Sequence, residues 1–241
     1  MQGIKAVAFD IDGTLWDYKN YIPESTITSI RKARENGHKC FINTGRARAY
    51  VYNKDLLDIG FDGIVSSCGC MIEYRNEVVF NHLVSRDDCI RTIDTVRRYG
   101  FKPILEGPEY LYMEITDFQD DMYGMKVISE MGEKLKGIDA CWGDWRMNKL
   151  SCICNVKLRE ECFDELSDLY DNILHSPEVV EMVPKGFSKG TGIREVCSLL
   201  GEDISQTIAF GDSPNDLEML KMAGKSVVMG RAPEEVKEIA T

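Results

Sequence analysis

The chain has 241 residues, of which 44% are hydrophobic and 29% are charged, and these proportions exclude wholesale disorder. Its 29 basic and 40 acidic side chains give a formal net charge of −11, which makes nucleic acid and anionic membrane surfaces unfavourable partners. No apolar run approaches the roughly 18 residues that a membrane helix needs, and acidic residues follow the first short apolar run, unlike in a signal peptide. We therefore expect a cytoplasmic enzyme or binding protein.

Short apolar runs alternate with helical patterns along the first third of the chain. Strands are predicted at Ile4–Phe9, Lys39–Asn43 and Phe61–Ser66, because each is a short, mostly apolar run. Helices are predicted at Glu24–Asn36 and Arg46–Ile59, each followed by a glycine of the kind that ends helices. Such alternation is typical of a doubly wound parallel sheet.

The middle of the chain, residues 82–184, has a different character. Two predicted strands flank a Gly-Pro turn there, which indicates a hairpin and hence an antiparallel sheet. We interpret this segment as an inserted α+β domain. Its predicted helices are Arg86–Tyr99, Gln119–Leu135 and Arg159–Ile173, and its predicted strands are Lys102–Glu106, Tyr110–Glu114, Lys149–Val156 and Glu178–Val183.

The opening pattern then returns in the last part of the chain. Helices are predicted at Gly190–Leu200 and Asn215–Met222, and strands at Thr207–Phe210 and Ser226–Met229. The expected fold is therefore α/β: a doubly wound, Rossmann-like parallel-sheet domain made of residues 1–81 and 185–241, interrupted by the α+β domain of residues 82–184.

Nine cysteines without a secretory signal indicate a reducing compartment. Cys68 and Cys70, like Cys152 and Cys154, are separated by one residue rather than by the two of common zinc sites. We expect these cysteines to be small buried apolar residues. A metal or redox role is the alternative, and no histidine nearby supports it.

Two acidic side chains follow the first predicted strand directly, in the segment Asp10–Thr14. Ligands of open α/β sheets bind beyond the carboxyl ends of strands. Residues two apart in extended chain point the same way, so Asp10 and Asp12 can face one cleft. Two like charges there require a divalent cation or a shared proton. A simple acidic turn is the structural alternative.

A second acidic segment, Gly211–Asp216, follows another predicted strand. If the sheet brings the two strand ends together, the oxygens of Asp212 and its neighbours suit Mg²⁺. Alone, the segment could be a turn that caps the next helix.

Two further positions suit a phosphate. Thr44 and Gly45 end the second strand and open a predicted helix, where a hydroxyl and backbone N–H groups can hold an anion, although a plain helix cap is the simpler interpretation of Thr44 alone. Lys189 also opens a predicted helix and can neutralise phosphoryl oxygens. A lone lysine there would ordinarily be a solvated surface charge, so it is the combination of segments that indicates a phosphate site.

The order of these segments closely resembles the haloacid dehalogenase superfamily. More narrowly, it is similar to the Cof-type sugar-phosphatase branch, which carries a large α/β (type II) cap between its second and third motifs. The resemblance extends over nearly the whole chain. The segments that carry it are Asp10–Thr14, Thr44, Ser188–Gly190 and Gly211–Asp216.

This resemblance implies a Mg²⁺-dependent phosphomonoester hydrolase acting on a small phosphorylated metabolite, such as a sugar phosphate, through an aspartyl-phosphate intermediate. It implies that Asp10 is the nucleophile and that Asp12 is first an acid and then a base. It also implies binding roles for several residues. The metal would be bound by Asp10, the Asp12 main-chain carbonyl and Asp212, with Asp216 supporting these ligands from nearby. The phosphoryl group would be bound by Thr44, Gly45, Lys189 and Asn215.

Three features depart from the family pattern. Similar sequences usually have Asn-Gly-Ala where this one has Cys68–Cys70, and often Met-Gly-Asn-Ala where this one has Met229–Ala232, with Arg231 in place of the asparagine. Many also continue past the position of Thr241 with another strand and helix. These departures touch none of the four motifs, so they bear on the substrate rather than on the chemistry.

Two other functions fit the same residues. A phosphomutase similar to phosphomannomutase would pass the phosphoryl group to a second sugar hydroxyl, and a non-catalytic protein that binds a phosphorylated ligand would need no nucleophile. The presence of Asp10 and Asp12 favours catalysis. Specificity is expected to lie in residues 82–184, where Trp142 and Trp145 could contact a sugar or simply pack inside the domain. Nothing in the sequence indicates an oligomeric state.

Overall fold

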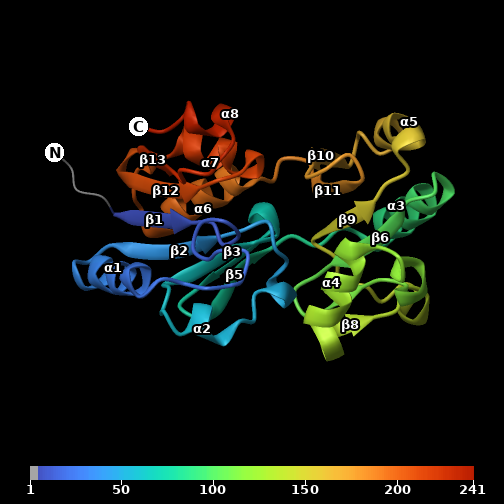
Figure 1. Ribbon diagram of the computed structural model, residues 1–241, viewed down its shortest axis with the longest axis horizontal. Helices are drawn as coiled ribbons and strands as arrows, with labels where there is room; N and C mark the ends of the chain where they lie inside the picture. Colours follow the sequence, from blue (N-terminus) through green and yellow to red (C-terminus); the bar gives the residue numbers. More distant parts are fainter. Residues whose placement is uncertain (1–4) are drawn as a thin grey trace. The chain divides into compact units, whose positions relative to one another are not determined.

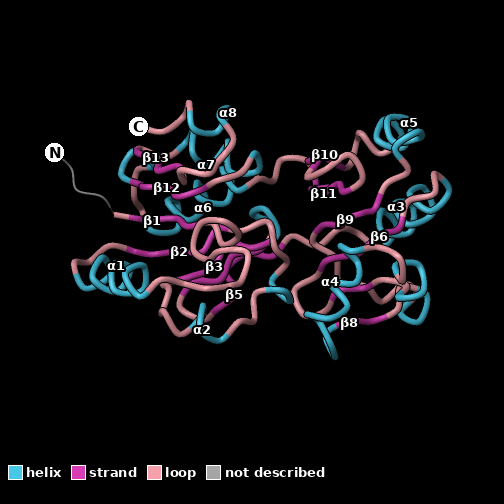
Figure 2. Tube along the Cα trace, viewed as in Figure 1, coloured by secondary structure: helices cyan, strands magenta, loops and turns pink. Residues whose placement is uncertain are grey.

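A computed structural model describes residues 5–241, which divide into two compact units, each with its own sheet and helices (Figures 1 and 2). Unit 1 combines the described residues up to Arg46 with Tyr52–Asn81 and Gly186–Thr241, and unit 2 combines Ala47–Val51 with His82–Lys185. None of the helices in the described range has the length and the apolar composition that a membrane span requires.

Within residues 5–241, unit 1 is built on a seven-stranded sheet of order β13-β12-β1-β2-β3-β4-β5. The strands from β13 to β3 pair in parallel, whereas β4 and β5 add an antiparallel hairpin at one edge. The strands are β1 (Ala6–Phe9), β2 (Lys39–Asn43), β3 (Gly63–Ser66), β4 (Met71–Tyr74), β5 (Glu77–Asn81), β12 (Thr207–Gly211) and β13 (Lys225–Val228).

Helices cover both faces of this sheet. In β2 the Cys40 thiol reaches the carbonyl of Ile30 in α1, whereas Phe41 packs in a cluster with Val196 of α6. Successive strand residues face opposite sides, so α1 and α6 lie on opposite faces, and the predicted doubly wound α/β fold is confirmed. The helices of unit 1 are α1 (Glu24–Glu35), α2 (Lys54–Leu57), α6 (Lys189–Leu200), α7 (Leu217–Met222) and α8 (Glu234–Lys237).

Unit 2 has a six-stranded sheet in the described residues, of order β10-β11-β9-β6-β7-β8, in which only the β7–β8 pair is parallel. On one face Leu150 and Cys152 pack with Ile93 of α3 and Cys162 of α5, and on the other face Ile153 packs near Val127 of α4. The elements are α3 (Arg86–Arg98), β6 (Lys102–Glu106), β7 (Leu111–Tyr112), α4 (Met122–Met131), β8 (Leu135–Lys136), β9 (Lys149–Ile153), α5 (Arg159–Glu165), β10 (Tyr170–Leu174) and β11 (Val179–Pro184).

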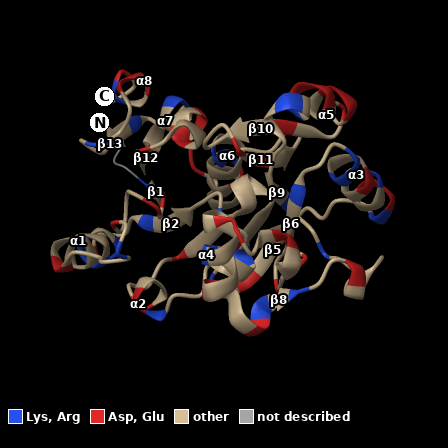
Figure 3. Ribbon diagram, turned by 45° about the vertical axis from the view of Figure 1, so that its right-hand side comes forward, with Lys and Arg blue, Asp and Glu red and all other residues tan. Residues whose placement is uncertain are grey.

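The long helix α3 carries both basic and acidic residues along its length (blue and red in Figure 3). Asp87 and Asp88 lie in its first turn and Arg97 and Arg98 in its last, an arrangement that complements the helix dipole. Ser85 caps the helix, because its side chain accepts a hydrogen bond from the N–H of Asp88. The predicted helix at Arg86–Tyr99 is therefore confirmed almost to the residue.

Two predicted helices are wrong in part. The segment Arg46–Ile59 contains only a single 3₁₀ turn, η1 (Arg48–Tyr50), and then α2, since Asn53 caps a new helix by accepting from the N–H of Leu56. The segment Arg159–Ile173 is helical only as far as Glu165, because its second half forms β10, which pairs with β11. Tertiary pairing outweighs local propensity in the second of these segments.

Other differences are smaller. The predicted helix Gln119–Leu135 is reduced to α4, which begins after the cap Asp121. The hairpin of β4 and β5 was not predicted, because its two-residue turn, Arg75 and Asn76, has positive φ at both positions without a glycine to mark it. Ile4, the first residue of the first predicted strand, lies outside the described residues. The remaining predicted strands and helices are confirmed with boundary shifts of a few residues.

The cysteines and the tryptophans of unit 2 have packing roles. All nine cysteines lie within the described residues, and all but Cys141 are buried. Trp145 is buried in the core of unit 2 and its indole N–H donates to the carbonyl of Ile138 at 2.9 Å. Trp142 is 45% exposed and packs edge-on against Trp145. The prediction that Cys68, Cys70, Cys152 and Cys154 are small buried residues is therefore confirmed.

A buried ion cluster crosses three adjacent strands of unit 2. The Lys149 ammonium in β9 lies 2.8 Å from the carboxylate of Glu106 in β6 and 2.8 Å from that of Glu181 in β11, and all three side chains are at most 5% exposed. His175 lies 2.9 Å from the other oxygen of Glu181. Burial alone would raise the pKa of Glu181, but Lys149 and His175 outweigh that effect and hold it well below its usual range. The two carboxylates therefore depend on Lys149 for compensation.

We expect Lys149→Met to lower the free energy of unfolding by about 3–5 kcal/mol, because removing one partner of a buried ion pair leaves uncompensated charge. The measurement is urea unfolding followed by circular dichroism. Lys126→Met is the matched control, since this lysine is 58% exposed on α4 and should change stability by no more than about 0.5 kcal/mol. Equal effects of the two substitutions would contradict the prediction.

Candidate active site

The strand order of unit 1 reverses at β1, whose neighbours are β2 on one side and β12 on the other. Open α/β sheets bind ligands at such a switch point, beyond the carboxyl ends of the strands. Phe9 pairs with Phe210, and the N–H of Asp10 donates to the carbonyl of Phe210 at 3.0 Å. Asp212 follows β12 directly. The fold thus brings the two acidic segments together, as predicted.

Lys189 is the first residue of α6 and is buried in spite of its charge. Ser188 and Thr191 fix the start of the helix with a capping box, in which each side chain accepts the other residue's N–H. The Lys189 ammonium lies 2.6 Å from Asp10 Oδ1, 2.7 Å from Asp216 Oδ1 and 3.0 Å from Asn215 Oδ1, a set that uses all three of its N–H donors.

The charge of Lys189 is maintained by its neighbours. Burial alone would lower the pKa of Lys189, but the carboxylates of Asp10 and Asp216 outweigh it and raise that pKa. The structure therefore places a permanent positive charge against one oxygen of Asp10. The solvated surface role, which the sequence left open for Lys189, is wrong.

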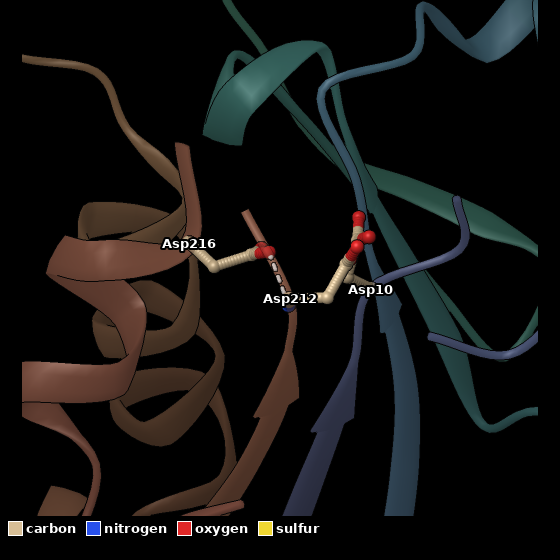
Figure 4. Close-up of side chains that lie close together, drawn as sticks. All are labelled: Asp10, Asp212 and Asp216. Atoms are coloured by element: carbon tan, nitrogen blue, oxygen red, sulfur yellow. Dashed lines mark hydrogen bonds between the residues drawn. The ribbon is translucent and has the colours of Figure 1, made fainter. Parts of the chain in front are cut away.

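Three carboxylates converge at this place, from the ends of β1 and β12 and from the following turn (Figure 4). One oxygen each of Asp10, Asp212 and Asp216 lies within 4.8 Å of the others. Burial raises the pKa of Asp10 to about 8, with Lys189 opposing and Asp216 adding to the shift. It also raises the pKa of Asp212. Three carboxylates beside one ammonium attract a divalent cation, and an all-oxygen donor set fits Mg²⁺.

Asp216 organises the turn that follows β12. Its Oδ2 accepts the N–H of Asp212 (dashed line in Figure 4) and the N–H of Ser213, each at 3.0 Å. The Asp212 carboxylate in turn accepts the hydroxyl of Thr14 at 3.1 Å, which ties the second acidic segment to the first. Gly13 has a φ of +85°, and a Cβ there would lie 2.1 Å from Asp212 Oδ2, so only glycine permits this approach.

The carboxylate of Asp12 belongs to a separate cluster. Arg46 grips it in a bidentate ion pair, with Nε 2.6 Å from Oδ2 and Nη2 2.7 Å from Oδ1. The Trp16 indole N–H donates to Oδ1 at 3.1 Å, and the Arg46 guanidinium lies over the Trp16 ring. A two-pronged pair of this kind fixes the orientation of a carboxylate. Neither Arg46 nor Trp16 was among the predicted site residues, although Arg46 follows Thr44 by only two positions.

Thr44 and Gly45 follow β2, the other neighbour of β1. The prediction that they open a helix is wrong, since the chain bends here and α2 begins only at Lys54. The buried Thr44 hydroxyl instead accepts the N–H of Arg46 at 3.1 Å and stabilises that bend. Thr44 thus helps to position the residue that holds Asp12, while phosphate binding by Thr44 and Gly45 stays a prediction.

A tight turn follows β3 and contains Cys68 and Gly69. Ser67, Cys68 and Gly69 form η2 (Ser67–Gly69), with consecutive φ values of 51°, 52° and 89°, an uncommon conformation for the first two. A Cβ on Gly69 would lie 2.6 Å from the carbonyl of Ser188. The turn therefore packs against the start of α6, immediately before Lys189, and the strained backbone supports the position of that helix.

The fold and this cluster define an α/β enzyme with a carboxylate-rich site at its switch point. The sequence model of the haloacid dehalogenase-like hydrolases matches residues 7–241, and the chain belongs to that family. The resemblance inferred from the four motifs is thereby confirmed.

Three similar proteins align with nearly the whole chain. YkrA of Bacillus subtilis (strain 168) is 26% identical over 236 residues, which cover 98% of this chain and 90% of YkrA. The 5-amino-6-(5-phospho-D-ribitylamino)uracil phosphatase YitU of the same organism is 25% identical, covering 97% of this chain and 89% of YitU. The solved structure of the HAD subclass IIB sugar phosphatase BT4131 is 25% identical and matches with a TM-score of 0.83, covering 98% of this chain and 91% of its own.

We expect Mg²⁺ to raise the melting temperature of the protein and Asp212→Asn to abolish that rise. Asparagine can still accept the Thr14 hydroxyl, but the substitution removes one anionic ligand of the metal. Without metal, the variant should be as stable as the parent, because the repulsion among the carboxylates falls. The measurement is differential scanning fluorimetry in chelator and in MgCl₂. Asp55→Asn, at an exposed position of α2, is the control and should keep the full response; an undiminished rise in Asp212→Asn would remove Asp212 from the metal site.

Proposed function

We propose that this hydrolase is a Mg²⁺-dependent phosphomonoesterase that acts on a small phosphorylated metabolite such as a sugar phosphate. The observation that carries the proposal is the buried Lys189 ammonium, which contacts Asp10 beside a cluster of three carboxylates. Phosphoryl transfer requires positioning and charge neutralisation more than covalent chemistry, and this arrangement supports both. The activities named for YitU and BT4131, on two different small phosphorylated molecules, support the substrate class.

In the first half of the reaction, a carboxylate oxygen of Asp10 attacks phosphorus and the bond from phosphorus to the substrate's alcohol oxygen breaks. The product on the enzyme is an aspartyl-phosphate. Asp12, protonated at this stage, donates its proton to the departing oxygen. The Arg46 ion pair holds both oxygens of Asp12 and stabilises its carboxylate form, which supports the base role of Asp12 in the second half of the reaction rather than this acid step.

In the second half, Asp12 is a carboxylate and removes a proton from water, whose oxygen attacks phosphorus. The bond from phosphorus to Asp10 breaks, which releases inorganic phosphate and regenerates both side chains. Asp10, the Asp12 main-chain carbonyl and Asp212 would hold Mg²⁺, with Asp216 supporting them. A bound Mg²⁺ neutralises charge on the phosphoryl oxygens and lets an anionic nucleophile approach them.

The phosphoryl oxygens are assigned to groups at the same edge of the sheet. Lys189 and Asn215, which lie 3.0 Å apart, support each other in this role, and Thr44 and Gly45 would add a hydroxyl and backbone N–H groups. Residues 82–184 would act as the cap domain that selects the departing part of the substrate. The net charge of −11 supports a small-molecule substrate over a nucleic acid.

The test is release of inorganic phosphate from a panel of sugar phosphates, nucleotides and pyridoxal phosphate, with MgCl₂ or with chelator. We expect Asp10→Asn to abolish release while the circular dichroism spectrum is retained, because the amide is not a nucleophile. Parent-like turnover in this variant would remove Asp10 from its role. Transfer to a second hydroxyl without phosphate release would establish the mutase, and binding of panel members without either reaction would establish the non-catalytic alternative.

Asp12→Ala should lower kcat by about 10²–10⁴, the usual contribution of a general acid and base. The measurement is steady-state kinetics on the best substrate of the panel. A loss below about tenfold would assign the proton to another group.

Arg46→Ala should lower kcat about 10- to 100-fold, since the Asp12 carboxyl group loses its orientation. Arg46→Lys should recover only part of this loss, because a lysine ammonium cannot donate two parallel N–H groups to both carboxylate oxygens. A double-mutant cycle separates positioning from a general structural effect. If Arg46 acts through Asp12, adding Arg46→Ala to Asp12→Ala costs little further activity. Full additivity would instead mean that Arg46 acts independently of Asp12.

A further inference from the structure

Arg231, which departs from the family pattern, lies at the same edge of the sheet as the carboxylate cluster. It follows β13, the outer strand, which pairs in parallel with β12, Phe210 opposite Val227 and Gly211 opposite Val228. The chain turns immediately after the strand, with the N–H of Ala232 donating to the carbonyl of Met229. This turn directs the exposed Arg231 side chain toward the end of β1 rather than away from the sheet.

The guanidinium of Arg231 contacts the loop that carries Asp12. Its Nη2 donates to the carbonyl of Gly13 at 3.1 Å. Gly13 is the next residue after Asp12 and lies directly against the Asp212 carboxylate. Arg231 therefore contacts, at a position open to solvent, the loop that joins Asp12, the proposed proton donor, to Thr14, which donates to Asp212.

Two carboxylates lie in the neighbourhood of Arg231, and neither forms an ion pair with it. Asp17 is already engaged, since its Oδ1 accepts the N–H groups of Lys19 and Tyr21. Asp212 accepts from Thr14 and belongs to the carboxylate cluster. Across residues 5–241, the carbonyl of Gly13 is the one hydrogen-bond acceptor of the Arg231 side chain, and no carboxylate oxygen lies within 4.0 Å of it.

Lys189 and Arg46, the other two cations described at the site, have other roles in the proposed mechanism, Lys189 toward the transferring phosphoryl group and Arg46 toward Asp12. Lys189 is buried and uses its donors on Asp10, Asn215 and Asp216, and Arg46 holds Asp12 with two N–H groups. A guanidinium has five N–H donors in a planar fork that matches a carboxylate or a phosphate. Arg231 donates one of these N–H groups to the carbonyl of Gly13, and its remaining N–H groups face solvent beside the site.

We propose that Arg231 binds an anionic group on the departing part of the substrate, so that the preferred substrate is a phosphomonoester with a second negative group, either a carboxylate or another phosphate. This inference rests on the proposed phosphatase function. It follows from the juxtaposition of an uncommitted guanidinium with the loop of Asp12, the residue that faces the departing oxygen in that mechanism.

The test compares three substrates that share a two-carbon skeleton. They are 2-hydroxyethyl phosphate, 2-phosphoglycolate and ethane-1,2-diol bisphosphate, and kcat/KM is measured for each with the parent protein, Arg231→Gln and Arg231→Lys. We expect Arg231→Gln to lower the ratio of kcat/KM for an anionic substrate over hydroxyethyl phosphate by about tenfold or more, as for the loss of a charge-assisted hydrogen bond. Arg231→Lys should lose less. The effect should appear in KM, because the contact is made to a group that does not react.

Arg194→Gln controls for the change in net charge, since Arg194 is an exposed arginine on α6 of the same unit, and it should leave both ratios unchanged. A binding measurement adds a readout without turnover: calorimetry with 2-phosphoglycolate in the Asp10→Asn background should show weaker affinity when Arg231→Gln is added.

The outcomes separate the inference from the function on which it rests. A selective loss on 2-phosphoglycolate assigns Arg231 to a carboxylate, and a selective loss on the bisphosphate assigns it to a second phosphate. Equal loss on all three substrates, or none, overturns the inference while leaving the phosphatase function in place. Absence of phosphate release from every substrate of this set and of the wider panel would overturn the function itself.

Discussion

The site depends on one buried ammonium group placed between two carboxylates. Lys189 joins the end of β1, through Asp10, to the turn after β12, through Asp216, and it does so from the first turn of α6. Burying such an ion pair contributes little net stability, because desolvation offsets much of the attraction. In the proposed reaction its value is preorganisation, because the positive charge that would oppose the charge of a phosphoryl group is already fixed before any ligand arrives.

The rest of unit 1 is arranged around that constraint. The capping box sets the position at which α6 begins, the turn at Ser67–Gly69 packs against the same point, and Gly13 lets the two acidic segments approach each other. Unit 2 also buries a lysine, Lys149, between two carboxylates, but there the partners lie on paired strands. Strand pairing fixes the positions of those residues, whereas Asp10 and Asp216, the partners of Lys189, lie beyond the carboxyl ends of β1 and β12.

Much of the fold and of the site could be predicted because both leave local signals. Parallel strands that are covered on two faces appear as short apolar runs, and the acidic residues after β1 and β12 occur in a fixed order with Lys189. The second half of Arg159–Ile173 was misassigned because its strand exists only through pairing with β11. Arg46 was missed for a similar reason: its contact with Asp12 spans 34 residues of sequence and leaves no local pattern.

Eight of the nine cysteines are buried, so chemical modification of their thiols reports whether the protein has opened. Burial raises the pKa of Cys40 in unit 1, and of Cys89 and Cys162 in unit 2, to about 12, so these thiols have almost no thiolate at neutral pH in the folded state. An alkylating reagent would therefore modify them only in molecules that have opened. Because both units contain such thiols, mass spectrometry of the modified peptides would time the opening of each unit separately, without any added label.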